Sequence, residues 1–441
     1  MKRILAIILT LSLAVAILPF AVGAEFVTKP MIAAGGEYTL ALRYDGTVWA
    51  WGANNQNQLG VFVAGNRRAT PMQIPGLSEI TAIAAGEVHS LALKNDGTVW
   101  VWGRNKGQLG LGDSFGRDTP TQIPGFSNIV AISSTYNHSM VLKSDGTVWE
   151  WGYDSMPEQV TVLTDIVSIA AGFGHSLALK KDGTVWAWGS NLYGQLGIGN
   201  TTNSNAPVQT VGLGDVISIA AGGRNSLAVK TDGTVWAWGN NVDGYFGSIV
   251  FPFYITTPRQ MAELNDVVSV SLYSGILALK RDGTVWAWGR NSQGELGLGD
   301  LNKRTEPTQI PGLSDASLII AGPRHSLIMK SNGTVWACGN NYHGQLGLGD
   351  ENDRFTPTQV QGPGGEGFLN LLHDRIPGDA NGNGEVITLD ALQILRYLFL
   401  PAPEKPVIHL SNSDVNEDGN VDMIDVLMIL QYCAGGIPEL L

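Results

Sequence analysis

The chain has 441 residues, 44% of them hydrophobic, and a formal net charge of −12. This length allows two or three domains with a large core, which must provide the stability because the only two cysteines, Cys338 and Cys433, lie far apart in unlike segments. The acidic balance excludes the broad basic face that nucleic-acid binding requires, so we expect no nucleic-acid partner.

Residues 1–24 are typical of a secretory signal peptide. Two basic residues precede an apolar run from Ile4 to Ile17, and small residues precede the expected cleavage before Glu25. An uncleaved membrane anchor is the alternative, but the run is shorter than the roughly 20 residues that span a bilayer. No later stretch is apolar enough to span a membrane. We therefore expect a secreted protein, extracellular or in a cell-surface complex.

Residues 25–361 are organised by one internal repeat. The string Asp-Gly-Thr-Val-Trp, with Asn for Asp in the last copy, recurs at intervals of 49 to 51 residues, except for one interval of 37. The copies begin at Asp45, Asp96, Asp145, Asp182, Asp232, Asp282 and Asn332. All 13 tryptophans lie in these copies, two in each, with Cys338 in place of the last one.

Each repeat reads as three or four short strands without a helical period. In the second unit, a run from His89 to Lys94 is followed by Asp-Gly, a pair that favours a tight hairpin turn, and by a returning strand from Thr98 to Gly103. Both faces of the returning strand are apolar, so both must be covered. Seven sheets arranged radially meet this need, and we predict a mainly β fold, a seven-bladed β-propeller. A linear solenoid is the alternative, but no distinct capping units are evident.

The repeat resembles that of the regulator-of-chromosome-condensation family. The phrases His-Ser-Leu-Ala-Leu-Lys, Asp-Gly-Thr-Val-Trp-Ala-Trp-Gly and Gly-Gln-Leu-Gly-Leu-Gly-Asp carry the resemblance. It implies a seven-bladed propeller, but not the nuclear exchange activity of the founding member, because this chain is acidic and expected to be exported. The family includes a secreted bacterial inhibitor of β-lactamases, so the scaffold can serve as a protein binder.

Two sets of equivalent positions carry polar side chains around the predicted ring. Four histidines share one position of the repeat, and we expect each to bond local backbone as part of the scaffold rather than to bind metal; they are His89, His138, His175 and His325. A basic residue ends the outgoing strand of every unit, from Arg43 to Lys330. We expect these to form a solvated rim, the alternative being a site for an acidic partner.

Two units depart from the repeat. The fifth has an aromatic-rich loop that is either a patch for a protein or sugar ligand, or a loop folded onto its own blade; its aromatic residues are Tyr245, Phe246, Phe251, Phe253 and Tyr254. The third has the stretch from Tyr153 to Val160 in place of the glycine-rich loop, which predicts a notch in the ring. The sequence shows no catalytic motif, although a carboxylate pair formed in space stays open.

Beyond residue 361 the composition changes, and we assign 362–375 to a linker and 376–441 to an acidic module. Two 12-residue segments, offset by 35, fit calcium loops of the EF-hand type, with oxygen ligands at positions 1, 3, 5, 7 and 12. The first offers Asp379, Asn381, Asn383, the Glu385 carbonyl and Asp390. The second offers Asp414, Asn416, Asp418, the Asn420 carbonyl and Asp425, with Asp422 acting through a water. We expect two calcium ions, bound more tightly by the second loop because it has more carboxylates.

Pro377 precedes the first loop, so an entering helix is not expected, but an apolar helix follows each loop and the two pack together. This loop-helix duplication resembles a dockerin domain, which implies binding to a cohesin domain of a scaffold protein in a multienzyme complex such as a cellulosome. The resemblance places the partner contacts at Thr388, Leu389, Arg396, Met423, Ile424 and Gln431. A calcium-stabilised tail without a partner is the alternative.

Together these features predict a monomeric, secreted component of a cellulosome-like complex for polysaccharide breakdown. Calcium-dependent dockerin–cohesin binding would anchor it, and the propeller would bind a protein or glycan. One alternative is a polysaccharide-degrading glycosidase or lyase with its site in the propeller. Another is a propeller inhibitor of a secreted enzyme.

Overall fold

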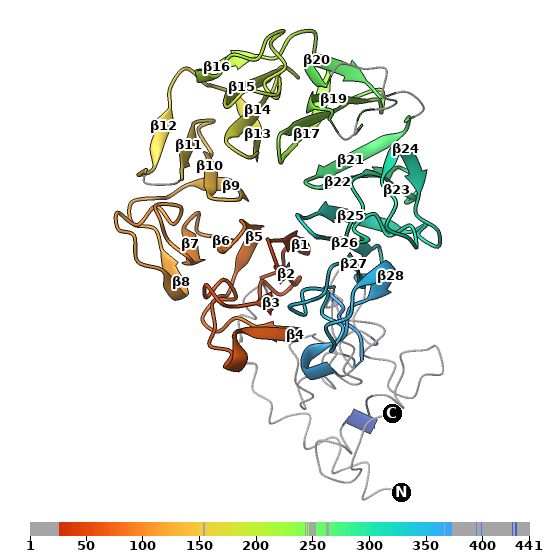
Figure 1. The fold of residues 1–441 in the computed structure, drawn as a ribbon. Helices are drawn as coiled ribbons and strands as arrows, with labels where there is room; N and C mark the ends of the chain where they lie inside the picture. The colour runs from red at the N-terminus through yellow and green to blue at the C-terminus, as the bar shows by residue number, and fades with distance from the viewer. Residues whose placement is uncertain are drawn as a thin grey trace, which may run out of the picture.

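A computed structural model of the chain describes residues 26–152, 155–242, 244, 246, 253–261, 264–365 and 367–372, with single positions at 394, 398, 426, 428 and 429. Within these residues, 28 strands form seven four-stranded antiparallel sheets arranged around a ring (Figure 1). The predicted seven-bladed propeller is therefore confirmed. None of the helices among the described residues is long and apolar enough to cross a membrane.

Each blade consists of four strands that are consecutive in the chain. Blade 1 contains β1 (Met31–Ala34), β2 (Tyr38–Leu42), β3 (Val48–Ala53) and β4 (Arg67–Gln73), and blade 2 contains β5 (Ile80–Ala85), β6 (His89–Lys94), β7 (Val99–Gly103) and β8 (Arg117–Gln122). Blade 3 contains β9 (Ile129–Thr135), β10 (His138–Lys143), β11 (Val148–Trp151) and β12 (Glu158–Val160), and blade 4 contains β13 (Ile166–Ala171), β14 (His175–Lys180), β15 (Val185–Gly189) and β16 (Ser204–Gln209). Blade 5 contains β17 (Val216–Gly222), β18 (Asn225–Lys230), β19 (Val235–Asn240) and β20 (Tyr254–Gln260), and blade 6 contains β21 (Val267–Leu272), β22 (Gly275–Lys280), β23 (Val285–Gly289) and β24 (Arg304–Gln309). Blade 7 contains β25 (Ala316–Ala321), β26 (His325–Lys330), β27 (Val335–Gly339) and β28 (Arg354–Gln359), and two short 3₁₀ turns, η1 (Ala64–Asn66) and η2 (Pro363–Gly365), complete the described elements.

The Asp-Gly-Thr-Val-Trp string builds the hairpin between the second and third strands of a blade. In blade 2, Asp96 Oδ1 accepts hydrogen bonds from the backbone N–H of Thr98 (3.0 Å) and from its hydroxyl (2.6 Å). Gly97 has φ 79°, a conformation that strongly favours glycine. The aspartate therefore caps the turn, which fixes the register of the returning strand.

The basic residues that end the second strands are half-buried rather than fully solvated. Lys330 Nζ lies 4.8 Å from the ring centroid of Trp336, and Lys280 Nζ lies 4.7 Å from that of Trp286. The expected solvated rim is therefore wrong in part, because these chains cover the first tryptophan of their own blade while their charged ends stay near solvent.

The shared histidine position links neighbouring blades. His89 Nε2 lies 2.9 Å from Ser139 Oγ of blade 3, and His175 Nε2 lies 3.0 Å from Ser226 Oγ of blade 5. His325 Nε2, 2.9 Å from Thr39 Oγ1, makes the same link between blades 7 and 1. The expectation that the four histidines bond local backbone is wrong in this respect, because His89, His175 and His325 bond a hydroxyl of the next blade. The fourth, His138, lies 3.2 Å from Glu150 Oε2 of its own blade.

The ring closes by packing between blades 7 and 1 and by the segment that follows β28. Leu369 and Leu371 are buried in the core cluster shared by the two blades. The Leu371 backbone N–H donates to the Gly333 carbonyl of blade 7, and its carbonyl accepts from the Tyr44 N–H of blade 1, both at 2.9 Å. This part of the stretch assigned to the linker therefore packs onto the propeller.

The buried histidines give the propeller a pH-dependent stability. Burial lowers the pKa of His89 and His175 to about 3 and that of His325 to about 4, from an ordinary value of 6.5. As the pH falls, these histidines therefore become protonated in the unfolded chain at a higher pH than in the folded propeller. The contribution of these histidines is complete above pH 6.5 and is lost progressively as the pH falls toward their folded pKa values. We predict that each lowers the free energy of unfolding by up to about 1.4 kcal/mol per pH unit between pH 6 and 4.

Urea unfolding of the propeller at a series of pH values measures this slope. His325→Asn places at this position the residue type found there in blade 5, Asn225, and should reduce the slope by the share of one histidine. A free energy of unfolding that is constant between pH 6.5 and 4.5 in the unsubstituted chain would contradict the prediction.

Candidate functional site

The glycine-rich loop after the third strand of a blade supplies a hydrogen-bond acceptor to the next blade. In blade 4, the Gln195 carbonyl accepts from Ser226 Oγ and from Trp238 Nε1 of blade 5, both at 2.8 Å. We call this pair of bonds the blade clasp. Equivalent acceptors at four further boundaries are the carbonyls of Gln58, Gln108, Glu295 and Gln345.

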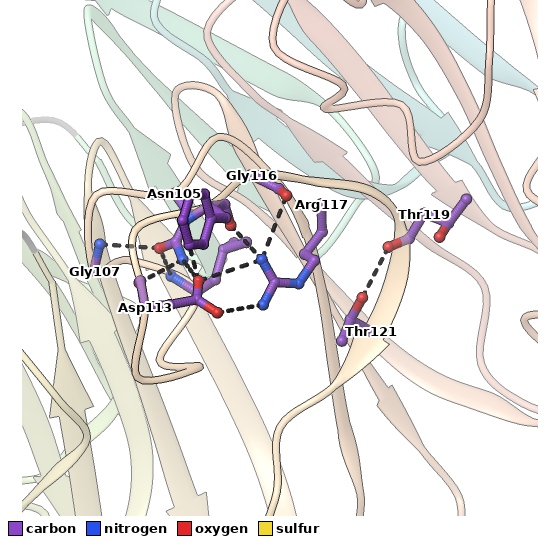
Figure 2. Close-up of polar contacts among 9 residues, drawn as sticks. Asn105, Gly107, Asp113, Gly116, Arg117, Thr119 and Thr121 are labelled. Atoms are coloured by element: carbon purple, nitrogen blue, oxygen red, sulfur yellow. Dashed lines mark hydrogen bonds and ion pairs between the residues drawn. The ribbon is translucent and has the colours of Figure 1, made fainter.

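Each such loop is held in shape by its own side chains. Figure 2 shows the loop of blade 2, where Asn105 Oδ1 accepts from the Gly107 N–H at 2.9 Å and Arg117 Nη2 pairs with Asp113 Oδ2 at 2.7 Å. The loop also places one apolar side chain between its blade and the next. In blade 2 this is Leu109, which has no exposed surface. A loop of this kind therefore contributes a polar clasp and an apolar plug.

Blade 3 lacks this loop, and a cavity of about 840 Å³ lies between blades 3 and 4 in its place. The predicted notch in the ring is thus present as a cleft. Blade 3 contributes Glu150 and Val160 to its lining, and blade 4 contributes Trp188, Asn205 and Pro207. We call this space the blade 3–4 cleft.

Glu150 replaces the missing carbonyl of the blade clasp. Its Oε1 accepts from Trp188 Nε1 at 2.9 Å, and its Oε2 accepts from Ser176 Oγ at 3.0 Å. His138 Nε2 lies 3.2 Å from the same Oε2. The other six units have a small apolar residue at this position; they are Ala50, Val101, Ala187, Ala237, Ala287 and Ala337. A glutamate between the two tryptophans of one repeat is the sequence signal that could have identified this site.

The cleft combines apolar walls with negative charge. Burial raises the pKa of Glu150, but the hydrogen bond and charge interaction with His138, together with the hydrogen bonds from Trp188 and Ser176, outweigh it, so the pKa lies below its usual value and the carboxylate is charged at neutral pH. Among the described lining residues, Glu158 is a second carboxylate and there is no lysine or arginine. These features suit a neutral or basic ligand with an apolar side and disfavour an anion.

The three described aromatic residues of the aromatic-rich loop in the fifth unit do not lie together in one surface patch. Phe246 is 6% exposed and belongs to the core between blades 4, 5 and 6, and its N–H donates to Asn241 Oδ1 as the plug residue of its loop does in other blades. Phe253 is 70% exposed, and the half-exposed ring of Tyr254 packs edge-on against Tyr193. Tyr245 and Phe251 lie outside the described residues.

The predicted calcium ligands and cohesin contacts also lie outside the described residues, as does the predicted signal peptide. In the two segments assigned to exit helices, positions 394, 398, 426, 428 and 429 are helical. Ile394 and Ile429 occupy equivalent places in the two segments, and both are fully buried. The described part of the chain holds no cluster of three or more metal-ligating side chains.

Comparison with known families assigns both parts of the chain. The model of the regulator of chromosome condensation (RCC1) repeat matches residues 45–93 and 96–142, a second model of this repeat matches 31–58, 80–108 and 129–156, and the RCC1-like domain matches 155–373. The dockerin type I domain matches residues 377–433.

Individual relatives match about a fifth of this chain. The human probable E3 ubiquitin-protein ligase HERC6 is 40% identical over 94 residues, which is 21% of this chain and 9% of that protein. The mitochondrial RCC1 domain-containing protein RUG3 of Arabidopsis thaliana is 41% identical over 97 residues, 21% of each chain. Both matches therefore span a small part of these relatives.

Solved structures agree on the fold. The crystal structure of Prp20p from Saccharomyces cerevisiae has a TM-score of 0.65 and 27% identity, covering 71% of this chain and 86% of that chain. Human WBSCR16 has a TM-score of 0.66 and 24% identity, covering 72% and 94% of the two chains.

Glu150→Ala, which introduces the residue most common at this position, should destabilise the propeller. It leaves Trp188 Nε1 and Ser176 Oγ without their acceptor, and we predict a loss of about 1–3 kcal/mol in the free energy of unfolding, measured by urea denaturation. Glu150→Gln keeps one acceptor oxygen, so its free energy of unfolding should lie between those of the parent and Glu150→Ala. Glu158→Ala is the control, because it removes an exposed carboxylate from the same blade and leaves the clasp acceptor intact. A Glu150→Ala protein as stable as the parent would refute the acceptor role.

Phe246→Ala and Phe253→Ala should have very different effects. Phe246 fills the core, so its truncation should cost about 3–5 kcal/mol. Phe253 is exposed, so its truncation should change the free energy of unfolding by less than about 0.5 kcal/mol. Urea denaturation of both variants measures the contrast, and similar values for the two would show that the assignment of Phe246 to the core is wrong.

Proposed function

The chain belongs to the RCC1 repeat family and carries a C-terminal dockerin type I domain, and from this premise we propose that it is a secreted component of a multienzyme, cellulosome-like complex. In this proposal the dockerin domain anchors the chain to a cohesin domain of a scaffold protein. The propeller then acts as a protein- or glycan-binding module. The observation that carries the proposal is the dockerin match at 377–433, directly after the last blade.

The donor set of the two loops supports calcium-dependent anchoring. Each loop offers at least five oxygen donors at the spacing that a hard cation requires, with glycine at the sharp turn. Calcium would hold the loop ends together and so position the exit helices for the partner. The second loop, with Asp414, Asp418, Asp422 and Asp425, has more carboxylates than the first, so we propose that it binds its ion more tightly.

The blade 3–4 cleft supports a binding role for the propeller rather than catalysis. Its buried carboxylate already accepts hydrogen bonds from Trp188 and Ser176 and lies against His138. A general acid or base must be free to exchange a proton with a substrate, whereas Glu150 is held as a structural acceptor. An aliphatic and aromatic wall beside it suits recognition.

We predict that the chain binds a cohesin module only with calcium present. Isothermal titration calorimetry of the full mature chain against a panel of cohesin modules should give binding that EDTA abolishes. Asp414→Ala should weaken it at least tenfold, about 1.4 kcal/mol, and Asp379→Ala should weaken it less, because the first loop binds its ion less tightly.

Asp232→Ala is the matched control, because it removes an exposed aspartate from a propeller turn and should leave cohesin binding unchanged. Cohesin binding that survives both EDTA and Asp414→Ala would rule out calcium-dependent anchoring.

A further inference from the structure

The blade 3–4 cleft lies at the place where, at other boundaries, the glycine-rich loop of one blade packs against the next blade. We call this place the seat of the loop. In other blades the glycine-rich loop packs directly on the second tryptophan of the next blade; a Cβ on Gly347 of blade 7 would lie only 2.8 Å from Trp51 Nε1 of blade 1. The loop also donates a backbone hydrogen bond to the fourth strand of the next blade. Gly199 N–H donates to the Thr256 carbonyl at 2.8 Å, and Gly349 N–H donates to the Ala69 carbonyl at 2.9 Å.

In blade 4 the corresponding surfaces face the cleft. Asn205 of β16 stands where Thr256 and Ala69 stand in β20 and β4. Asn205, Ala206 and Pro207 line the cavity together with Trp188. The core cluster between blades 3 and 4 includes Trp188 but, among its described members, no plug leucine from a loop. The equivalent clusters contain one, as with Leu346 between blades 7 and 1. Blade 4 therefore has the surface against which a glycine-rich loop packs at other boundaries, but blade 3 has no such loop to cover it.

Glu150 allows this seat to exist without a loop. A deletion alone would leave two buried donors of blade 4, the Trp188 indole and the Ser176 hydroxyl, without an acceptor, which is costly. Because the carboxylate satisfies both, the cleft needs no polar group from an occupant to keep the fold intact. What the seat still lacks is the apolar plug and the backbone donor to β16.

We propose that the blade 3–4 cleft binds, in trans, a surface turn of a partner protein that carries an aliphatic side chain between glycines. The aliphatic side chain enters the cleft between Val160 and Pro207, since Trp188 itself is only 2% exposed. A backbone N–H of the turn donates to the Asn205 carbonyl. This inference rests on the proposed role of the propeller as a binding module and specifies its partner. The negative charge of Glu150 and Glu158 selects against an acidic turn.

A peptide turn fits the walls of the cleft better than a glycan does. Stacking on a sugar ring requires a broad exposed aromatic face, but Trp151 and Trp188 are each only 2% exposed. The more exposed rings at the rim, Tyr136 and Phe173, pack against each other with centroids 4.7 Å apart. The same kinds of wall hold a peptide turn at other boundaries of this ring.

The test uses a fluorescein-labelled, C-terminally amidated peptide with the sequence of residues 341–349, which contains no acidic residue and belongs to the loop of blade 7 that packs against blade 1. Fluorescence anisotropy with the full mature chain should show saturable binding. Ala206→Trp, a change on the exposed face of β16, fills the cleft and should weaken binding at least about tenfold. The peptide carrying Leu346→Asp should lose binding to a similar extent, because it brings a charge to the plug position.

Val211→Trp is the control, because Val211 is an exposed residue of blade 4 outside the cleft, and the variant should bind the peptide like the parent. Urea denaturation checks that both tryptophan variants are folded. Absence of saturable binding, or equal binding by the parent and a folded Ala206→Trp protein, would overturn the proposal. So would cellohexaose binding that Ala206→Trp removes while the peptide does not bind, since it would assign the cleft to a glycan. Cohesin binding is measured on the same preparation, so a failure of the anchoring proposal is recognised separately from a failure of this one.

Discussion

One backbone carbonyl, offered by the glycine-rich loop of a blade to the next blade at five boundaries, is the contact on which this ring depends. A hydroxyl and an indole of the following blade are buried against it, as Ser226 and Trp238 are against Gln195. Because an unsatisfied buried donor costs about 1–3 kcal/mol, a boundary with these two donors needs an acceptor at this place. This requirement accounts for the recurrence of the loop, the serine and the second tryptophan together in one repeat. The boundary between blades 5 and 6 differs, since Ile276 replaces the serine and Trp288 Nε1 has no hydrogen-bond partner among the described residues.

Departures from the repeat follow from the same requirement. Blade 3 lacks the loop, and the Glu150 carboxylate accepts the two hydrogen bonds that a loop carbonyl accepts elsewhere. The boundary therefore stays satisfied although the missing loop leaves a cleft. In blade 7, Cys338 stands in place of the second tryptophan and makes only a long contact, 3.8 Å, to the Glu295 carbonyl. Burial raises the pKa of this thiol to about 12, so it stays protonated and acts as a small core residue.

The cleft lies far along the ring from the blade that precedes the dockerin domain in the chain. The last strands of the propeller form blade 7, whereas the cleft lies between blades 3 and 4, which stand across the ring from blade 7 (Figure 1). Such a chain can bring a captured protein to a complex, and the two affinities can be measured independently.

The sequence by itself determined the number of blades, the hairpin turns and the dockerin domain, because each is written in a local, repeated pattern such as Asp-Gly-Thr-Val-Trp or the spaced oxygens of a calcium loop. Even the notch follows from one short interval. Only the tertiary structure decided that Phe246 fills the core, that three of the four histidines bond across blade boundaries and that Glu150 accepts hydrogen bonds from Trp188 and Ser176. These roles depend on which residues of two neighbouring blades face each other. The packing of the blades into a ring decides this, and no local sequence pattern does.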